Sequence, residues 1–187
     1  MDNKPVKYYV ITDTHFCHDK MVGWGHRPLN FNQIIINQWR VTVQPQDVVF
    51  HLGDVAWGNQ KQLIPIMSAL SGTKILIRGN HDRGHSNNWF IKAGFAAVLE
   101  KAQVSRTILS HFPAILNQDE LDRDIINVHG HFHNIPTKKW EPELIDRITP
   151  NHYLLSLEEV GYKPISMELI RKRKFIKNTK KLLESER

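Results

Sequence analysis

Short apolar runs alternate with amphipathic stretches along the first half of this chain. Three runs are rich in β-branched and aromatic residues, and they predict strands at 6–12, 47–53 and 73–79. The stretch after the first run has Ile35 and Trp39 four residues apart, and it predicts a helix over 31–43 with Asn30 as N-cap. The stretch after the second run carries apolar residues at i, i+3, i+4 and i+7 and predicts a helix that stops at Gly72. This alternation predicts parallel strands with helices on their faces.

The pattern changes in the second half of the chain. A short helix is expected near 85–93. Further strands are expected at 95–100, 104–112 and 124–133, and the last two are separated by a polar stretch at 117–124. We therefore expect a sandwiched α/β domain.

Polar residues with metal-binding or acid–base chemistry follow five of these apolar runs. They are Asp13 and His15 after the first run, Asp54 after the second, Asn80, His81 and Asp82 after the third, and His111, His131 and His133 after the later ones. In open α/β sheets, ligands bind beyond the carboxyl ends of the strands. We expect these side chains to gather at one edge, and glycines at 53, 79 and 130 to let the backbone turn sharply beside them.

Imidazole and carboxylate without thiolate suit Mn, Fe, Zn, Ni or Co. The single cysteine, Cys17, excludes an internal disulfide and a thiolate-rich zinc cluster. The two i, i+2 pairs, Asp13 with His15 and His131 with His133, each place both side chains on one side of an extended segment. Two neighbouring ions need a shared anion, and the set supplies seven ligands if one carboxylate is shared.

Composition and charge limit the classes of protein to which this chain can belong. Apolar residues make up 41% and charged residues 24% of the 187 residues, as in ordinary globular proteins. No apolar run reaches the roughly 18 residues of a membrane span, so we expect no membrane partner. The single cysteine fits a reducing, cytoplasmic setting. The net charge is +6, and the eight basic and two acidic residues from Arg171 onward account for all of it.

We therefore expect a domain over 1–170 and a basic tail over 171–187. In the tail region Leu169, Ile176 and Leu183 recur every seven residues. This spacing favours a helix docked on the domain by its apolar stripe. The alternative is an arm that holds nucleic acid through phosphate contacts.

The ordered set D-x-H (13–15), G-D (53–54), G-N-H-D (79–82), His111 and G-H-x-H (130–133) resembles the calcineurin-like metallophosphoesterase superfamily. The resemblance covers about residues 8 to 133. It implies two stacked mixed β-sheets flanked by helices, with a dinuclear metal site at the strand ends.

The resemblance also implies roles for single residues. One metal would be held by Asp13, His15 and His133, and the other by Asn80, His111 and His131. Asp54 would bridge both ions. His81 would stand near the leaving-group oxygen as a general acid, with Asp82 orienting its imidazole.

The implied reaction is phosphoester hydrolysis by a hydroxide that bridges two divalent ions, with Mn favoured. The second motif reads GDVAWGN and lacks the arginine of the protein phosphatases in this superfamily. The segments at 13–18, 27–28 and 162–166 are similar to small bacterial or phage phosphoesterases. The expected substrate is a phosphodiester, cyclic or nucleotide-derived, in preference to a monoester.

Two other functions stay open, namely a nuclease that uses the basic tail and a non-catalytic metal-binding interaction module. The sequence also leaves the natural substrate and the oligomeric state open. For His18 and Arg27 we weigh a substrate contact against a surface role. His51 and His129 are expected in the core or behind the ligands, and Trp24, Trp57 and Trp89 are expected to pack loops.

Overall fold

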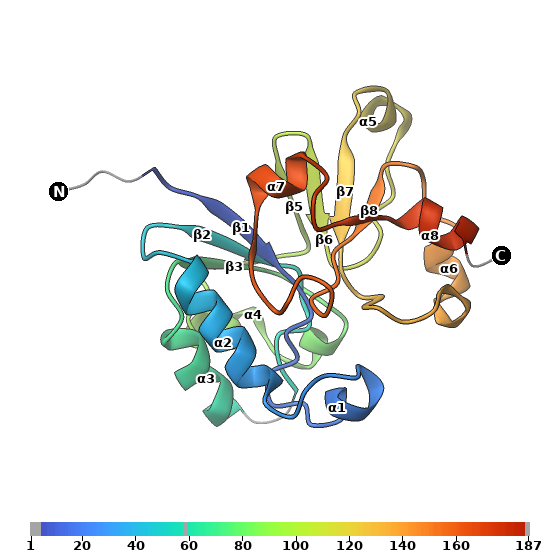
Figure 1. The fold of residues 1–187 in the computed structure, drawn as a ribbon. Coiled ribbons are helices and arrows are strands. Elements are labelled where there is room, and N and C mark those ends of the chain that lie inside the picture. Colours follow the sequence, from blue (N-terminus) through green and yellow to red (C-terminus); the bar gives the residue numbers. More distant parts are fainter. Residues whose placement is uncertain (1–4, 58–59, 186–187) are drawn as a thin grey trace.

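The computed structural model describes residues 5–57 and 60–185 of the chain. Within these residues the strands form two five-stranded sheets with helices around them (Figure 1). The first sheet has the order β4 (Ala97–Leu99), β3 (Thr73–Ile77), β2 (Val48–His51), β1 (Tyr8–Ile11) and β9 (Ile165–Ser166). The second has the order β10 (Lys177–Asn178), β8 (His152–Leu154), β7 (Ile126–His129), β6 (Thr107–Ser110) and β5 (Lys101–Val104). Both sheets mix parallel and antiparallel neighbours, which confirms the predicted fold class.

The strands that precede the polar motifs are parallel and end level with one another. In the first sheet Ile11 pairs with His51, and His51 pairs with Leu76 on the next strand. In the second sheet Ser110 at the end of β6 pairs with His129 at the end of β7. The residues that follow these five strands therefore leave the two sheets at their carboxyl edges.

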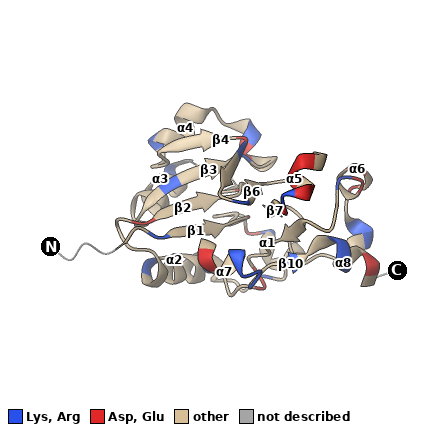
Figure 2. Cartoon of the chain, turned by 90° about the horizontal axis from the view of Figure 1, so that it is seen from above, with Lys and Arg blue, Asp and Glu red and all other residues tan. Residues whose placement is uncertain are grey.

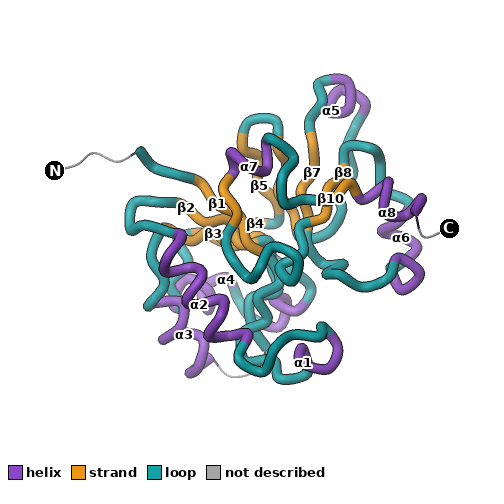
Figure 3. Tube along the Cα trace, in the orientation of Figure 1, coloured by secondary structure: helices purple, strands orange, loops and turns teal. Residues whose placement is uncertain are grey.

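Helices pack on both sheets. On the first sheet, α7 (Met167–Arg171) contacts β1 and α4 (Asn87–Lys92) contacts β4, while α8 (Thr179–Ser185) contacts β8 of the second. The remaining helices are α1 (Met21–Trp24), α2 (Phe31–Thr42), α3 (Gln60–Ser68), α5 (Gln118–Asp122), α6 (Pro142–Ile145) and the 3₁₀ turns η1 (His81–Gly84) and η2 (Thr137–Lys139). Much of the second half of the chain is loop (Figure 3).

The main core joins the two sheets. It contains Ile11 of β1 and Leu109 and Val128 of β6 and β7, all without exposed surface, together with Ile35 and Trp39 of α2. A second cluster lies under the loops that follow β7; its buried members are Phe132, Trp140, Leu144, Ile148, Leu154 and Leu183. None of the helices in the described part of the chain is long and apolar enough to cross a membrane.

Several local details differ from the expectations. The strand expected at 104–112 is shorter, because β6 covers Thr107–Ser110 and Val104 belongs to β5. The polar stretch at 117–124 contains the helix α5, because Asn117 accepts a hydrogen bond from the Glu120 N–H and the Glu120 side chain accepts one from the Asn117 N–H. This capping box is an N-x-x-E pattern that the sequence displays. Asn30 precedes α2 as expected, but its side chain makes no capping hydrogen bond.

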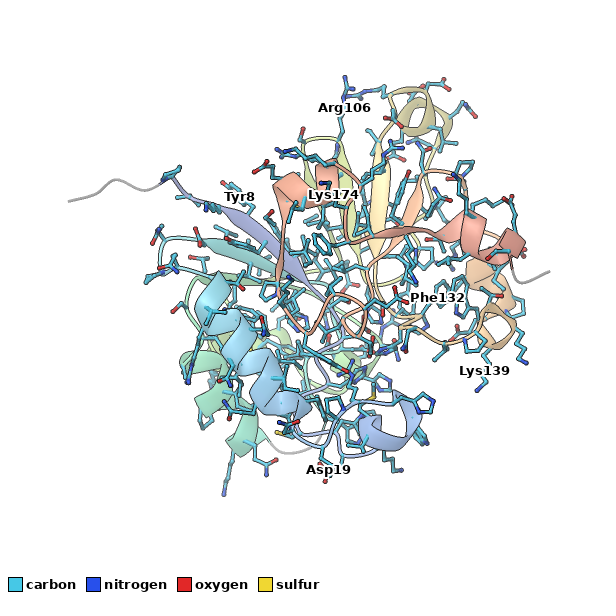
Figure 4. All side chains as sticks on the ribbon, viewed as in Figure 1. Tyr8, Asp19, Arg106, Phe132, Lys139 and Lys174 are labelled. Carbon is cyan, nitrogen blue, oxygen red and sulfur yellow. The ribbon has the colours of Figure 1, made fainter. Side chains whose placement is uncertain are left out.

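The C-terminal segment is not one continuous helix. It turns after α7, forms β10 antiparallel to β8, and then enters α8. Ile176 and Leu183 are buried, Ile176 in the main core and Leu183 in the second cluster. Phe132, which is labelled in Figure 4, is another buried member of the second cluster. A functional division of the chain at residue 170 stays a prediction.

Candidate metal centre

The five motif loops meet where the carboxyl edges of the two sheets face each other. Within the first sheet, the Asp13 N–H donates to the Gly53 carbonyl over 3.0 Å. Within the second, the Gly130 N–H donates to the His111 carbonyl over 3.1 Å. Across the sheets, the His131 N–H donates to Asp13 Oδ2 over 3.1 Å. These backbone contacts bring residues from both sheets into one buried site.

Five of the seven predicted ligands have left-handed backbone conformations. Their φ angles are 50° at Asp13, 46° at His15, 55° at Asp54, 69° at His131 and 49° at His133. A non-glycine residue in this region costs of order 1–3 kcal/mol and persists where its surroundings fix it. Such strain clusters at functional sites.

Two glycines allow the backbone to touch the carboxylates of the site. A Cβ added at Gly79 would collide with Asp54 Oδ1, and it would lie 2.6 Å from the Asp54 nitrogen. A Cβ added at Gly130 would collide with Thr12 Oγ1 and Asp13 Oδ2. Neither glycine has a left-handed φ, so close approach, and not the sharp turn we expected, explains the residue type.

The carboxylate and imidazole atoms fall into two groups that share Asp13. In one, Asp13, His15 and His133 bring ligand atoms within 4.8 Å of one another; in the other, Asp13, Asp54 and His111 do so. Asp54 Oδ2 lies 3.6 Å from His15 Nε2 and also 3.6 Å from His111 Nε2. It therefore stands between one histidine from each predicted ligand set, as a bridging carboxylate would.

Several polar atoms of this site are buried without a hydrogen-bond partner among the described residues. They are Asp13 Oδ1 and both ring nitrogens of His15. Their residues are 1% and 2% exposed. Buried polar atoms normally have partners, and leaving them unpaired is costly. A divalent cation would satisfy them.

His111 and Asn80 give a second test of the fit. The His111 Nδ1–H donates to the Leu52 carbonyl over 2.7 Å, which leaves a lone pair on Nε2 of the neutral ring. That nitrogen lies 2.9 Å from the oxygen of the Asn80 amide. Burial lowers the pKa of His111 to about 4, so the ring is neutral at pH 7. The lone pairs of His111 Nε2 and of the Asn80 oxygen face each other, as expected of two ligands that bind one cation.

The two aspartates differ in their ease of ionisation. Burial opposes ionisation of Asp13, but the surrounding histidines, His133 foremost, hold the pKa of Asp13 below its ordinary value. Burial, followed by the carboxylates of Asp13 and Asp82, raises the pKa of Asp54 to about 9. A site that gathers acidic groups so closely calls for cations to offset their mutual repulsion.

Glu158 is a functional candidate that the motif analysis missed. Its Oε1 accepts a hydrogen bond from His133 Nδ1 over 3.1 Å, so the His133 Nε2 is left to face Asp13 Oδ1 at 3.7 Å. Burial opposes ionisation of Glu158, but hydrogen bonds from His133 and Arg27 lower its pKa to about 2. The glutamate thus fixes the imidazole tautomer that a metal ligand needs. No sequence motif marks it, because it lies 25 residues beyond His133.

Arg27 supports the same corner of the site. Its side chain is fully buried, and it donates to Glu158 Oε1 over 2.6 Å and to the carbonyls of Asp13 and Thr14 over 2.7 and 2.9 Å. These contacts fit neither of the two roles that the sequence left open for Arg27, a substrate contact and a surface position. Arg27 instead holds the loop that carries Asp13 and His15.

His131 lies beside the site but is turned partly away from it. Its ring packs edge to face against His111, with 5.1 Å between the ring centroids. Its Nε2 lies 3.1 Å from Glu141 Oε1, on a glutamate whose side chain is 53% exposed. Within residues 5–57 and 60–185, Nδ1 of His131 has no hydrogen-bond partner, and metal ligation by His131 stays a prediction.

His81 and Asp82 occupy different environments. His81 Nε2 lies 3.8 Å from Asp54 Oδ2, and its side chain is 35% exposed, so it can reach a bound substrate. Asp82 is buried and accepts hydrogen bonds from the N–H groups of Gly79, Asp54 and Val55 over 2.8, 2.8 and 3.0 Å. Asp82 therefore fixes the two motif turns, and no hydrogen bond to the His81 ring is found among the described residues.

The other histidines near the motifs are satisfied parts of the core. His51 is fully buried; its Nδ1 accepts from the Gly53 N–H, and its Nε2 lies 2.9 Å from Thr14 Oγ1. His129 is also fully buried, with its Nε2 3.0 Å from Thr179 Oγ1 at the start of α8. Both match the supporting role expected from the sequence.

Comparison with known proteins identifies a family and several similar chains. The model of the calcineurin-like phosphoesterase family matches residues 6–181. The uncharacterized protein MJ1445 of Methanocaldococcus jannaschii is 31% identical over 173 residues, which cover 88% of this chain and 89% of that protein. The crystal structure of the protein AQ665 of unknown function from Aquifex aeolicus superposes with a TM-score of 0.67 at 29% identity, over 90% of this chain and 100% of that one. The nuclease MPE of Pseudomonas putida gives a TM-score of 0.48 at 16% identity, over 67% and 61% of the two chains.

Proposed function

This chain belongs to the calcineurin-like phosphoesterase family, which implies metal-dependent phosphoester hydrolysis, and we propose that its substrate is a phosphodiester cleaved at a centre of two divalent ions. The observation that carries the two-ion proposal is the position of Asp54 Oδ2, which is equidistant from His15 Nε2 and His111 Nε2 at 3.6 Å. One ion would be held by Asp13, His15 and His133, and the other by Asn80, His111 and His131. Asp54 would bridge them.

Bound ions would supply an activated water as nucleophile and would neutralise charge on the phosphoryl oxygens. Manganese is proposed first, with Fe, Zn, Ni or Co as alternatives, because the ligands combine imidazole with carboxylate and amide oxygen. The protein side chains supply the rest. His81 reaches the site from an exposed position and would donate a proton to the departing oxygen.

The lining beside His81 favours a diester over a monoester. Among the described residues, the pocket there is lined mainly by imidazole and indole rings, with Met21 and Ile135 beside them and Lys20 as its one lysine or arginine. Arg27 is buried and already engaged by Glu158. A monoanionic diester needs less added positive charge than a dianionic monoester, so this lining suits the diester.

The proposal is tested by turnover and metal counting on the same protein. The chain is stripped with a chelator and reloaded with Mn²⁺, and hydrolysis of bis(p-nitrophenyl) phosphate is compared with that of p-nitrophenyl phosphate. We expect two ions per chain by elemental analysis, a higher kcat/KM for the diester, and reduced occupancy of both sites in Asp54→Asn. Metal-independent turnover, a preference for the monoester or full occupancy in Asp54→Asn would contradict the proposal.

A further inference from the structure

A pocket of about 200 Å³ opens beside the candidate metal centre. Its lining includes His15, His81 and His133 from the centre and the rings of Trp24 and Trp57. The pocket is several times larger than the roughly 30 Å³ that one water molecule occupies in the liquid. A group bound in it would lie next to the side chains that face the reacting phosphate.

The two tryptophans of this pocket are unusually open to solvent. Trp24 is 68% and Trp57 is 47% exposed, whereas Trp39 and Trp140 are 0% and 5% exposed in the two core clusters. Both rings pack on His18, in keeping with the loop-packing role expected from the sequence, yet each keeps a large area open to solvent. Exposed aromatic rings that converge on a concave site are typical of binding surfaces.

His18 fills the space between the two indoles. Its ring stacks on Trp57 with 4.6 Å between centroids and 12° between planes, and it meets the edge of Trp24 at 6.0 Å and 83°. His18 is 5% exposed, and neither of its ring nitrogens has a hydrogen-bond partner in the described part of the chain. A neutral imidazole carries one donor and one acceptor, so a ligand that stacks here also meets hydrogen-bonding capacity.

Backbone contacts hold the loops that carry His18 and Trp57 against each other. Phe16 and Ala56 form a parallel bridge between the two loops, and the Trp57 N–H donates to the Phe16 carbonyl over 3.0 Å. His81 packs edge to face against the same indole, with 4.8 Å between centroids. A rigid stacking surface loses little conformational entropy on binding.

From these contacts we infer that the pocket lined by His18, Trp24 and Trp57 binds a nucleobase, and that the substrate is a phosphoester carrying a base next to the reacting phosphate. A base offers a flat π face for the indoles and an edge of donors and acceptors for the imidazole. The statement about the substrate rests on the proposed function. Base binding itself does not, and it can be measured without hydrolysis.

Binding is tested by titrating the full chain with adenosine and, in parallel, with ribose 5-phosphate. Tryptophan fluorescence and calorimetry report the dissociation constant. Trp24→Leu and Trp57→Leu should each weaken adenosine binding by about 5- to 150-fold, the range for loss of one base–aromatic stack. His18→Phe keeps a stacking ring and loses both nitrogens, so it should weaken binding by about 2- to 10-fold. Binding of ribose 5-phosphate should be insensitive to all three changes.

Trp89→Leu is the matched control. Trp89 is a partly buried tryptophan that stacks on His85 with 4.1 Å between centroids and does not line the pocket. It should leave adenosine binding unchanged. Thermal melting checks that each variant is folded, and the high exposure of Trp24 makes Trp24→Leu the safest of them. The inference is overturned if the parent does not bind adenosine, or if the parent, Trp24→Leu and Trp57→Leu bind it equally well.

A kinetic arm separates this inference from the proposed function. Adenosine 2′,3′-cyclic phosphate and glycerol 1,2-cyclic phosphate share a strained diester and differ in the base. Trp24→Leu, whose ring does not pack on His81, should lower kcat/KM for the adenosine ester, mainly through KM, by more than it lowers kcat/KM for the glycerol ester. Equal losses on both esters count against the base subsite. If neither ester nor any other phosphoester is hydrolysed, the proposed function fails while adenosine binding still decides the inference.

Discussion

Among single side chains, Glu158 links the metal centre to the buried cation Arg27. Replacing it with alanine removes the partner of His133 Nδ1 and leaves the Arg27 charge buried without its carboxylate. Loss of such a partner typically lowers metal affinity about 10- to 100-fold. We expect Glu158→Ala to do this in calorimetric metal titrations, and to destabilise the fold by about 3–5 kcal/mol through the unpaired arginine.

Glu158→Gln and Glu159→Gln are the matched variants for this prediction. The glutamine retains an acceptor for His133, so it should lose less metal affinity than alanine. Glu159 is exposed and pairs with Lys177, so its substitution should change neither metal affinity nor stability beyond a few tenths of a kcal/mol. Unchanged metal affinity in Glu158→Ala would show that His133 does not depend on this contact.

His81 is the residue for which binding and chemistry can be separated. Burial lowers the pKa of His81, and the Asp82 carboxylate partly opposes this shift. His81→Ala should retain two metals and lose about 10²- to 10⁴-fold in turnover, the range for general acid catalysis. The loss should be larger for an alkoxide leaving group than for nitrophenolate, which needs no proton. Equal losses on the two would instead assign His81 to phosphate positioning.

His51 makes folding stability depend on pH. Burial lowers its pKa to about 3, and its Nδ1 must stay unprotonated to accept from the Gly53 N–H. The unfolded chain binds this proton at about pH 6.5 and the folded chain only near pH 3, so the contribution is complete above pH 6.5 and is lost as the pH falls towards 3. The slope is at most about 1.4 kcal/mol per pH unit.

Urea unfolding of the metal-free chain between pH 5 and 8 measures this slope. His51→Gln should reduce it, because the titrating group is gone. His26 is exposed and has a left-handed φ of 50°, which asparagine tolerates, so His26→Asn is the control that should leave the slope unaltered. An identical slope in His51→Gln and the parent would show that protonation of His51 does not limit stability.

The sequence pattern indicates the candidate ligands, but not the contacts that hold them in place. Asp13, Asp54 and Asn80 are recognisable because each follows an apolar run, a pattern visible in sequence. The contact of Glu158 with His133 depends on how two loops meet, and it joins residues 25 positions apart in the chain, so no local spacing encodes it. The left-handed φ of the ligands is a backbone property that the motifs do not display.

Among the helices and strands, β10 and α8 connect the C-terminal segment to the strand that precedes His131. Thr179 contacts the His129 ring, and Leu183 packs in the cluster with Phe132 and Trp140, whose rings stack at 4.1 Å. Leu183→Ala should lower the free energy of unfolding by about 2–3 kcal/mol, at the lower end for buried leucine.

The same urea measurement on Lys181→Ala provides the comparison within α8. Lys181 is exposed, so its replacement should stay within about 0.5 kcal/mol of the parent. Equal stability of the two variants would mean that α8 does not depend on its apolar contact with the second cluster.

The element predictions succeeded where one short pattern decides the structure. β1, β2 and β3 follow apolar runs, and α2 follows the spacing of Ile35 and Trp39. The seven-residue recurrence of Leu169, Ile176 and Leu183 suggested one helix, but the chain forms β10 between α7 and α8. Pairing with β8 satisfies backbone groups there, and a periodicity of side chains cannot reveal that partner strand.

In the whole molecule, the distribution of charge bears on the choice between a docked tail and a nucleic-acid arm. Figure 2 shows basic and acidic residues interspersed near α7 and α8. Three tail cations already pair with carboxylates: Lys172 with Glu168, Arg173 with Asp124 and Lys177 with Glu159. These pairs favour docking, because a paired cation is less available to a phosphate.

We expect a chain ending at Ile170 to lose stability, since it lacks β10 and the buried Leu183, and to retain turnover of a small diester per folded molecule. The full chain should show a shallow dependence of RNA affinity on salt. Each phosphate contact would add about 0.7–0.9 to the negative slope of log affinity against log salt. Binding at several salt concentrations measures this slope.

A triple variant, Arg171→Gln with Lys174→Gln and Lys181→Gln, removes exposed charge and leaves β10 and α8 in place. It should fold as stably as the parent. A steep salt slope in the parent that disappears in this variant would contradict the docked tail and support the nuclease alternative.

The candidate ligands follow strands of both sheets: Asp13, His15, Asp54 and Asn80 follow strands of the first, and His111, His131 and His133 follow strands of the second. Ions held between these residues would connect the two sheets. A ligand present at 100 times its dissociation constant adds about 2.7 kcal/mol to the folded state. A cell that lacks the metal would then lose more than the activity. The less stable metal-free chain would unfold more often and be degraded by proteases, so the amount of the protein would follow the supply of the ion.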